Sequence, residues 1–176
     1  EKHGIPVTET FAGKGTLHYS NPFNLGGIGA TGTKGANEIA KNSDLVIGIG
    51  TRYGDFTTAS KSVWQNKNVD FININVAEFD AFKNSAIPLQ GDARETLKII
   101  SQKLENHSTD EGYIEKIKIL NKEWDDIVSK IYRTEDPKRP VQSELIGAVN
   151  EFMYEQDVVL CAAGSAPGDL HKLWRT

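Results

Sequence analysis

Four short runs of apolar residues along the chain are typical of buried strands. They cover residues 5–10, 44–50, 69–75 and 158–162. The second and third are almost continuously apolar rather than alternating, which predicts strands covered on both faces, as in parallel sheets. A shorter apolar run, residues 87–89, predicts an edge strand.

Segments with helical spacing of apolar residues lie between and after these runs. Residues 33–42 predict a short helix, and residues 92–104 predict a longer one. Asp92 is placed to cap this second helix, with Glu95 three positions on, the spacing of a capping box. Residues 113–132 predict one long helix. Strands that alternate with helices imply right-handed crossovers and a doubly wound sheet.

The character of the chain changes after residue 104. A polar stretch, residues 105–111, precedes the long helix, and Pro137 and Pro140 are expected to end it. Ser143 is expected to cap a further helix over residues 144–154.

We therefore expect an α/β fold with a doubly wound, mostly parallel sheet. Residues 1–105 are expected to form a Rossmann-like central domain that lacks its first strand. A helical linker, residues 106–140, and the truncated start of a second α/β domain, residues 141–176, are expected to follow. Both ends look cut, because a strand-plus-helix unit normally precedes such a sheet and residues 170–176 stop in a helix without a capping residue.

Composition narrows the classes of function. The 20 Lys and Arg residues are outnumbered by 24 Asp and Glu residues, and no basic run is present. Nucleic acid is therefore not an expected partner, since phosphate neutralisation needs such a run. No apolar run approaches the roughly 20 residues of a membrane helix, so no membrane partner is expected. The single cysteine, Cys161, excludes an intramolecular disulfide and fits a cytoplasmic location.

Residues able to hold a metal or act as nucleophiles are scattered. The four histidines are His3, His18, His107 and His171, and none is spaced to share a metal with another or with Cys161. Cys161 lies within a predicted strand, which favours a buried apolar role over a nucleophilic one. A Ser-His-Asp triad dispersed in sequence stays open. We expect no metal site and assign no catalytic residue.

Residues 27–32 match the pattern G-x-G-x-x-G. A dinucleotide site needs a strand before this pattern, and residues 21–25 are predicted to form a loop instead. A P-loop is also disfavoured, because Lys34 is displaced by one position and no hydroxyl residue follows it. The pattern favours a tight turn into a helix, whose N-terminal amides could still hold an anion.

Two further glycine-containing segments follow predicted strands, residues 48–55 and 163–169. Ligands of open α/β sheets bind at the carboxyl ends of strands, so both segments are candidate phosphate contacts. Arg52 could meet a phosphate or pair with a carboxylate, and the sequence leaves both open. The second segment could equally be a turn built by Pro167 and Gly168.

An ordered set of motifs then carries a resemblance to a known family. These are residues 4–7, 13–15, 26–35, 44–52, 72–75 and 91–93. They resemble the central domain of thiamine-diphosphate-dependent enzymes of the acetolactate synthase type. Residues 158–174 resemble the opening of the following domain, which carries the diphosphate site. The resemblance covers nearly the whole chain.

Residues 32–40, 50–62 and 164–170 are most similar to the branch that hydrolyses trihydroxycyclohexane-1,2-dione in myo-inositol catabolism. The resemblance implies a longer enzyme that opens this cyclic dione by carbon–carbon cleavage. Thiamine diphosphate would supply the carbanion chemistry, Mg²⁺ would accompany it, and the enzyme would be a homodimer or homotetramer. The alternatives are another acetolactate synthase-type enzyme, or a module that binds a nucleotide or flavin without catalysis.

The resemblance also assigns site residues, though none of them is catalytic. The activating glutamate and the Gly-Asp-Gly magnesium motif of the family are expected outside this chain, so the chain alone is expected to be inactive and to bind no cofactor. Gly164, Ser165 and Ala166 match a loop that approaches thiamine diphosphate. Some relatives hold FAD on loops that match Gly29, Thr31 and Gly32, and Gly50, Thr51 and Arg52. Because the hydrolase chemistry needs no flavin, these six residues are expected to form a vestigial pocket.

Overall fold

The strands of the computed structural model are all parallel to their neighbours and form two sheets within the described residues, 2–133, 136 and 138–176. The first sheet pairs β1 (Val7–Glu9) with β2 (Asn24–Gly27). The second has the order β3 (Leu45–Ile49), β4 (Asp70–Asn75) and β5 (Ile87–Gln90).

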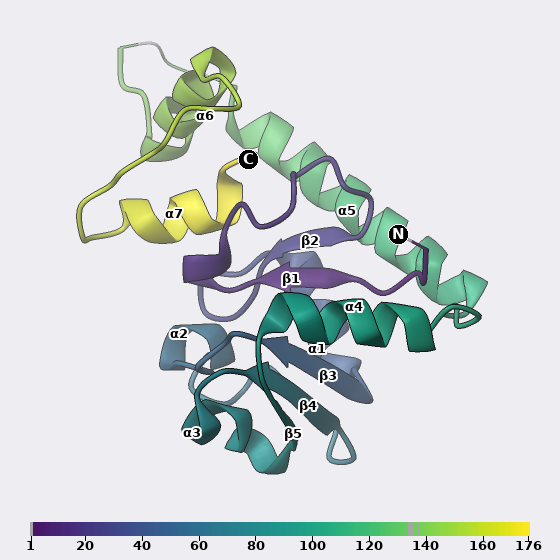
Figure 1. Ribbon diagram of the computed structural model, residues 1–176. Helices are drawn as coiled ribbons and strands as arrows, with labels where there is room; N and C mark the ends of the chain where they lie inside the picture. The colour runs from purple at the N-terminus through teal and green to yellow at the C-terminus, as the bar shows by residue number, and fades with distance from the viewer. Residues whose placement is uncertain (1, 134–135, 137) are drawn as a thin grey trace.

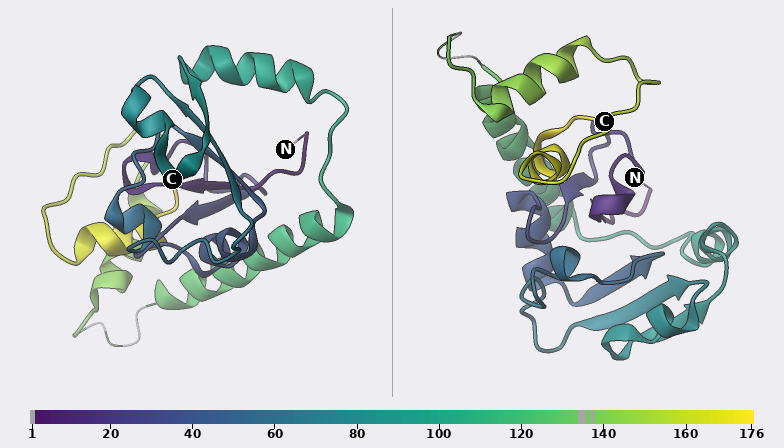
Figure 2. Two further views of the ribbon diagram at one scale, coloured as in Figure 1. Left: turned by 90° about the horizontal axis from the view of Figure 1, so that it is seen from below. Right: turned by 90° about the vertical axis from the view of Figure 1, so that its left-hand side faces the viewer.

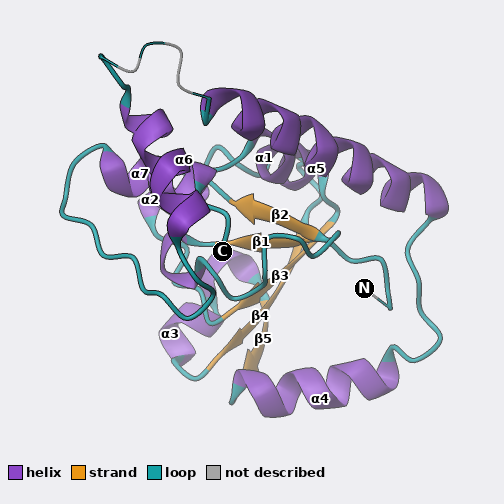
Figure 3. Cartoon of the chain, turned by 90° about the horizontal axis from the view of Figure 1, so that it is seen from above, coloured by secondary structure: helices purple, strands orange, loops and turns teal. Residues whose placement is uncertain are grey.

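The division into two sheets falls between β1 and β3. Figures 1 and 3 both show β1 lying between β2 and β3, although β1 and β3 are in different sheets. A doubly wound sheet has the strand order 3-2-1-4-5-6. If strand 1 is left out, strands 2 and 3 correspond to β1 and β2, strands 4, 5 and 6 correspond to β3, β4 and β5, and the sheet divides between β1 and β3. Leu45 and Ile49, at the two ends of β3, are each 46% exposed, as expected of a strand with one unpaired edge. The expected fold class is confirmed.

Helices surround these strands, and Figure 3 shows α1 and α5 on one side of them and α4 on the other. The α-helices are α1 (Lys34–Asn42), α2 (Asp55–Thr58), α3 (Glu78–Ala81), α4 (Ala93–Lys103), α5 (Glu111–Ile131), α6 (Gln142–Phe152) and α7 (Ala166–Leu173). Short 3₁₀ turns, η1 (Phe11–Gly13) and η2 (Lys83–Ser85), follow β1 and α3. The helices predicted over residues 33–42, 92–104, 113–132 and 144–154 correspond to α1, α4, α5 and α6. The helix in which residues 170–176 were expected to stop is α7, but it ends at Leu173, so the last three residues lie outside it.

The main core lies where α5 packs over β2 and α1. Ile117 and Leu120 on α5 meet apolar side chains of the β2 region and α1; these are Phe23, Leu25, Ala36 and Ile39. A second cluster joins the other half of α5 to α6 and α7 through Val128, Tyr132, Ile146 and Leu173. Trp124 packs against this second cluster, as its helical spacing predicted. Helix α5 therefore contributes to the core along much of its length.

The prediction of a loop over residues 21–25 is wrong at its carboxyl end, because β2 starts at Asn24. The sequence Asn-Leu-Gly-Gly has little β-propensity, but β1 supplies a partner on one side. The Val7 amide donates to the Phe23 carbonyl at 2.8 Å, and the Ile28 amide donates to the Glu9 carbonyl at 3.0 Å. Tertiary pairing thus overrides local preference.

The predicted strand over residues 158–162 is also wrong. Val158 and Leu160 are 80% and 90% exposed, and none of the described strands lies in a ladder with this segment. An apolar run forms a strand only where a neighbouring strand accepts its hydrogen bonds. For the same reason Cys161 is an exposed free thiol rather than a buried apolar residue.

Helix ends agree with the sequence in part. Asp92 caps α4 by accepting a hydrogen bond from the Glu95 amide at 3.0 Å. Ser143 does not cap α6, which begins one residue before it; the Val141 amide donates to the Glu144 carboxylate at 2.8 Å instead. Pro137, one of the two prolines expected to end the long helix, lies outside the described residues.

Candidate functional site

The residues singled out by the sequence lie on three turns. The first glycine turn, residues 27–33, joins β2 to α1, and the second glycine turn, residues 50–54, joins β3 to α2. The third, which we call the α7 turn, is residues 163–166. The correction of β2 means that the first glycine turn does follow a strand and precede a helix, the setting that a phosphate-binding turn requires.

The backbone amides of the first glycine turn are bound within the protein. The Gly29 amide donates to the Asn37 side-chain carbonyl at 2.9 Å, and the Asn37 amide group donates back to the Gly29 carbonyl at 3.0 Å. The Ala30 amide donates to the Phe56 carbonyl at 2.8 Å, and the Gly32 amide to the Gly29 carbonyl at 3.0 Å. These amides are therefore directed at protein acceptors and not at an open site.

Close packing explains why glycine occupies the first turn. Gly29 has a φ of +95°, and a Cβ atom there would lie 2.0 Å from the Phe56 carbonyl oxygen. A Cβ on Gly32 would lie 2.7 Å from the Gly27 carbonyl oxygen. The turn thus brings its backbone against α2, and its glycines are required by the fold whether or not a ligand binds.

Thr31 links the first glycine turn to α7 through a buried histidine. The Thr31 hydroxyl is hydrogen-bonded to His171 Nδ1 at 2.9 Å, and His171 Nε2 lies 3.1 Å from the Glu9 carbonyl. Burial lowers the pKa of the His171 imidazole, with the Glu9 carbonyl opposing the shift and the charge of Lys14 adding to it. No sequence pattern indicates this contact, because 140 positions separate the two residues.

The second glycine turn is open by comparison. Gly50 has a φ of +63°, and no atom lies within 4 Å of the position of a Cβ atom on it. The Thr51 carbonyl accepts from the Asn75 side chain at 3.1 Å, and the Arg52 carbonyl accepts from Lys83 Nζ at 2.7 Å. The Arg52 side chain is exposed and has no ion pair within the described part of the chain.

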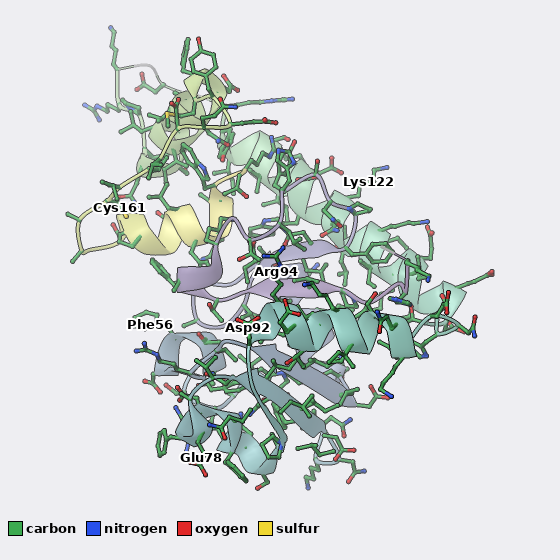
Figure 4. All side chains as sticks on the ribbon, in the orientation of Figure 1. Phe56, Glu78, Asp92, Arg94, Lys122 and Cys161 are labelled. Atoms are coloured by element: carbon green, nitrogen blue, oxygen red, sulfur yellow. The ribbon has the colours of Figure 1, made fainter. Side chains whose placement is uncertain are left out.

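The residues that follow the second turn differ in their burial. Tyr53 has a φ of +50°, and its hydroxyl donates to the Asn73 side chain at 2.6 Å. Burial raises the pKa of the Tyr53 hydroxyl, so this group stays protonated and serves as a donor. Phe56 on α2 is exposed and is labelled in Figure 4 beside the same turn. The second turn therefore combines a fixed backbone with free side chains.

The α7 turn is exposed and its backbone is accessible. Gly164 has a φ of +133° with no atom within 4 Å of a Cβ position. The Ser165 hydroxyl donates to the Gln142 side-chain carbonyl at 3.1 Å, and the Gln142 amide group donates to the Asp169 carboxylate. Such an accessible turn at the start of a helix fits the approach of a phosphate group. Figure 4 shows Cys161 on the long coil that leads to it.

The three turns do not converge on one set of reactive groups. A Cβ on Gly168 of α7 would lie 3.0 Å from the Thr31 methyl group, so α7 contacts the first turn. In the part of the chain that the structure covers, no three His, Cys, Asp or Glu side chains are grouped to hold a metal ion. No helix among the described residues is long and apolar enough to cross a membrane. Within the described residues the three turns therefore remain separate parts of the surface, joined only where α7 contacts the first turn.

Comparison with known proteins gives a consistent result. Residues 1–100 match the family described as "Thiamine pyrophosphate enzyme, central domain". The chain is 37% identical over 198 aligned positions to a protein of Clostridium tetani (strain Massachusetts / E88) named 3D-(3,5/4)-trihydroxycyclohexane-1,2-dione hydrolase, with 99% of this chain covered. A protein of the same name from Bacillus thuringiensis (strain Al Hakam) is 38% identical over 198 positions, again with 99% of this chain covered. The chain spans 31% of the length of each of these two relatives.

Proposed function

Because the chain belongs to the thiamine pyrophosphate enzyme central-domain family, we propose that it is the middle of an enzyme that hydrolyses trihydroxycyclohexane-1,2-dione. The observation that carries the proposal is the 37% identity, over 99% of this chain, to a hydrolase named for that substrate. The reaction is the cleavage of a carbon–carbon bond in a cyclic dione, a step in inositol catabolism. Other acetolactate synthase-type reactions are the alternative.

Within this enzyme we propose that residues 1–105 act as a scaffold and that residues 106–140 link it to the diphosphate-binding domain begun by residues 141–176. When bound, thiamine diphosphate supplies the carbanion chemistry of the reaction. Gly164, Ser165 and Ala166 would approach it, which is supported by the open backbone at Gly164. Mg²⁺ and the activating carboxylate would be held by residues outside this chain. The chain alone is therefore expected to be inactive.

The remaining proposals concern the setting of the longer enzyme. We expect it to act in the cytoplasm as a homodimer or homotetramer, because sites in this family form between subunits. The acidic balance of 24 Asp and Glu residues against 20 Lys and Arg residues supports a small-molecule substrate over nucleic acid.

The decisive experiment uses the longer enzyme and the purified cyclic dione. Ring opening should require added thiamine diphosphate and Mg²⁺, and a Gly164→Val variant should bind thiamine diphosphate at least tenfold more weakly. Gly50→Val is the matched control, because Gly50 also has a positive φ and no atom lies within 4 Å of either Cβ position. Ring opening that is unaffected by removing thiamine diphosphate would refute the proposal. A different acyl substrate turned over in its place would select the alternative.

We also propose that six residues on the first and second glycine turns form only a vestigial nucleotide or flavin pocket; these are Gly29, Thr31, Gly32, Gly50, Thr51 and Arg52. The amides of Gly29 and Ala30 already bind protein acceptors, which supports a structural role for the first turn. The free Arg52 side chain leaves the second turn as the place where any residual affinity would lie. Titration of the chain with FAD, NAD and ADP should give no saturable binding below millimolar concentrations. Tight binding that is lost in Arg52→Ala would show that the pocket is functional.

A further inference from the structure

A small cavity lies between the loop that precedes β2, helix α5 and the last residues of the chain, and Thr33 at the end of the first glycine turn forms part of its wall. Its volume is about 120 Å³. A single water molecule needs roughly 10–15 Å³ measured in this way, so the cavity has room for several waters or for one compact anion.

The charged groups around the cavity are mostly positive. Lys14, Lys172 and Arg175 line it, together with the single carboxylate of Asp125, which leaves a net charge of +2. Neutral polar residues, Ser20 and Asn121 among them, and apolar residues such as Leu25 and Trp124 complete the wall. A lining of this charge and polarity matches a doubly charged oxyanion better than it matches a neutral molecule or a monocarboxylate.

Arg175 is held rigidly with an unused donor. Its Nη2 donates to the Ser129 hydroxyl at 2.9 Å and to the Asp125 carbonyl at 3.2 Å. Its guanidinium carbon lies 5.5 Å from the Tyr19 ring centre and 5.4 Å from that of Tyr132. Its Nε is buried and has no acceptor among the described residues. Nη2 also lies 3.7 Å from the Asp125 carboxylate, and the buried Nε is inaccessible from the cavity, so Arg175 contributes positive charge to the wall while the two lysines supply the free donors.

The two lysines also lack a full counter-charge. Burial lowers the pKa of the Lys14 ammonium, and the nearby charge of Glu9 opposes this only in part. Neither Lys14 nor Lys172 makes an ion pair or side-chain hydrogen bond within the residues that the structure describes. We propose that this cavity binds a phosphate group, either as free phosphate or as part of a small phosphate monoester. The site is independent of the proposed hydrolase reaction.

Isothermal titration of the 176-residue chain with inorganic phosphate at constant ionic strength tests the proposal. Saturable binding is expected, with no heat from chloride or acetate at the same ionic strength. Lys172→Gln should weaken phosphate binding about tenfold, because it removes a positive charge that has no ion pair in the described residues. The matched control is Lys122→Gln, an exposed lysine on α5 outside the cavity lining (Figure 4), which should leave affinity unchanged.

Asp125→Asn separates binding from loss of structure, because it should raise phosphate affinity severalfold by removing the one negative charge of the lining. Titration with glycerol phosphate distinguishes the two sources: tighter binding than inorganic phosphate identifies a monoester, and weaker binding identifies the free ion. Equal heats for phosphate and chloride would overturn the proposal, as would a folded Lys172→Gln variant with unchanged affinity.

Discussion

The two sheets consist of similar short parallel strands, yet they are covered very differently. The β1–β2 pair lies under α5, α1 and α7, and Figure 2 shows these helices gathered around it. The β3–β4–β5 sheet has an exposed edge at β3, and α4 has no fully buried side chain. The β1–β2 pair thus has a well-covered core, whereas the β3–β4–β5 sheet has apolar side chains that no other element covers.

The turns at the carboxyl ends of the two sheets show the same difference. The first glycine turn is packed against α2 and contacts α7, and its amides are bound within the protein. The second glycine turn has free space at Gly50, and its Arg52 side chain has no ion pair among the residues that the structure describes. Glycines at equivalent places in an α/β sheet therefore serve different purposes, and a sequence motif alone does not separate them.

Adding a methyl group to each of the two turns tests directly whether one is closed and the other open. Gly29→Ala places a Cβ atom 2.0 Å from the Phe56 carbonyl oxygen at a φ of +95°, so the free energy of unfolding should fall by about 4 kcal/mol or more. Gly50→Ala, at a φ of +63° with free space, should cost only about 1 kcal/mol. Urea denaturation measures both. Equal losses would show that the first turn is not closed in solution.

The unpaired edge of β3 leads to a second prediction, about the stability of the β3–β4–β5 sheet. A longer segment of the same protein that supplies a parallel strand between β1 and β3 would cover Leu45 and Ile49, each now 46% exposed. Burial of these two side chains should stabilise the domain by about 3 kcal/mol and slow amide exchange along β3. The amides of β2, which is already paired and covered, are the internal control. An unchanged exchange rate in β3 would contradict the missing-strand interpretation of the topology.

The sequence predicted a strand correctly where its residues alone favour a strand and where a neighbouring strand is available to pair with it. β3 and β4 were found because each is a long apolar run that pairs with the next strand along the chain, and Asp92 marked the start of α4. β2 was missed because its pairing with β1, and not its residues, makes it a strand. The strand expected over residues 158–162 failed for the converse reason, since its residues have β-propensity but no neighbour.

In the candidate site, too, local features could be predicted from the sequence and long-range contacts could not. The position of Gly29, Gly50 and Gly164 on turns could be predicted, because turn residues act locally. The contact between Thr31 and His171, and the exposure of Arg52, depend on which distant segments meet. No spacing rule reaches across 140 positions, so these features required the structure.

Thr33 caps α1 at the end of the first glycine turn. The buried Thr33 hydroxyl donates to the Leu25 carbonyl at 2.6 Å and accepts from the Ala36 amide at 3.0 Å. Thr33→Val keeps the shape but leaves both groups unpaired, so it should cost about 2 kcal/mol. Thr33→Ser keeps the hydroxyl and should cost less, which makes it the matched control. Thermal unfolding of the two variants ranks them, and the reverse order would show that the methyl group matters more than the cap.

The stability of the β1–β2 pair and its covering helices should also depend weakly on pH, because His171 is buried there. Burial lowers the folded-state pKa of His171 below its ordinary value of about 6.5. The unfolded chain therefore binds a proton more readily, so stability should be fully present above pH ~6.5 and decline as the pH falls toward the folded-state pKa. His171→Asn should remove part of this decline, whereas His18→Gln, at an exposed histidine, should leave it unchanged. The urea concentration at the midpoint of unfolding, measured for each variant between pH 7.5 and 5, tests this expectation. An identical decline in His171→Asn would mean that α7 does not hold His171 against the first turn in solution.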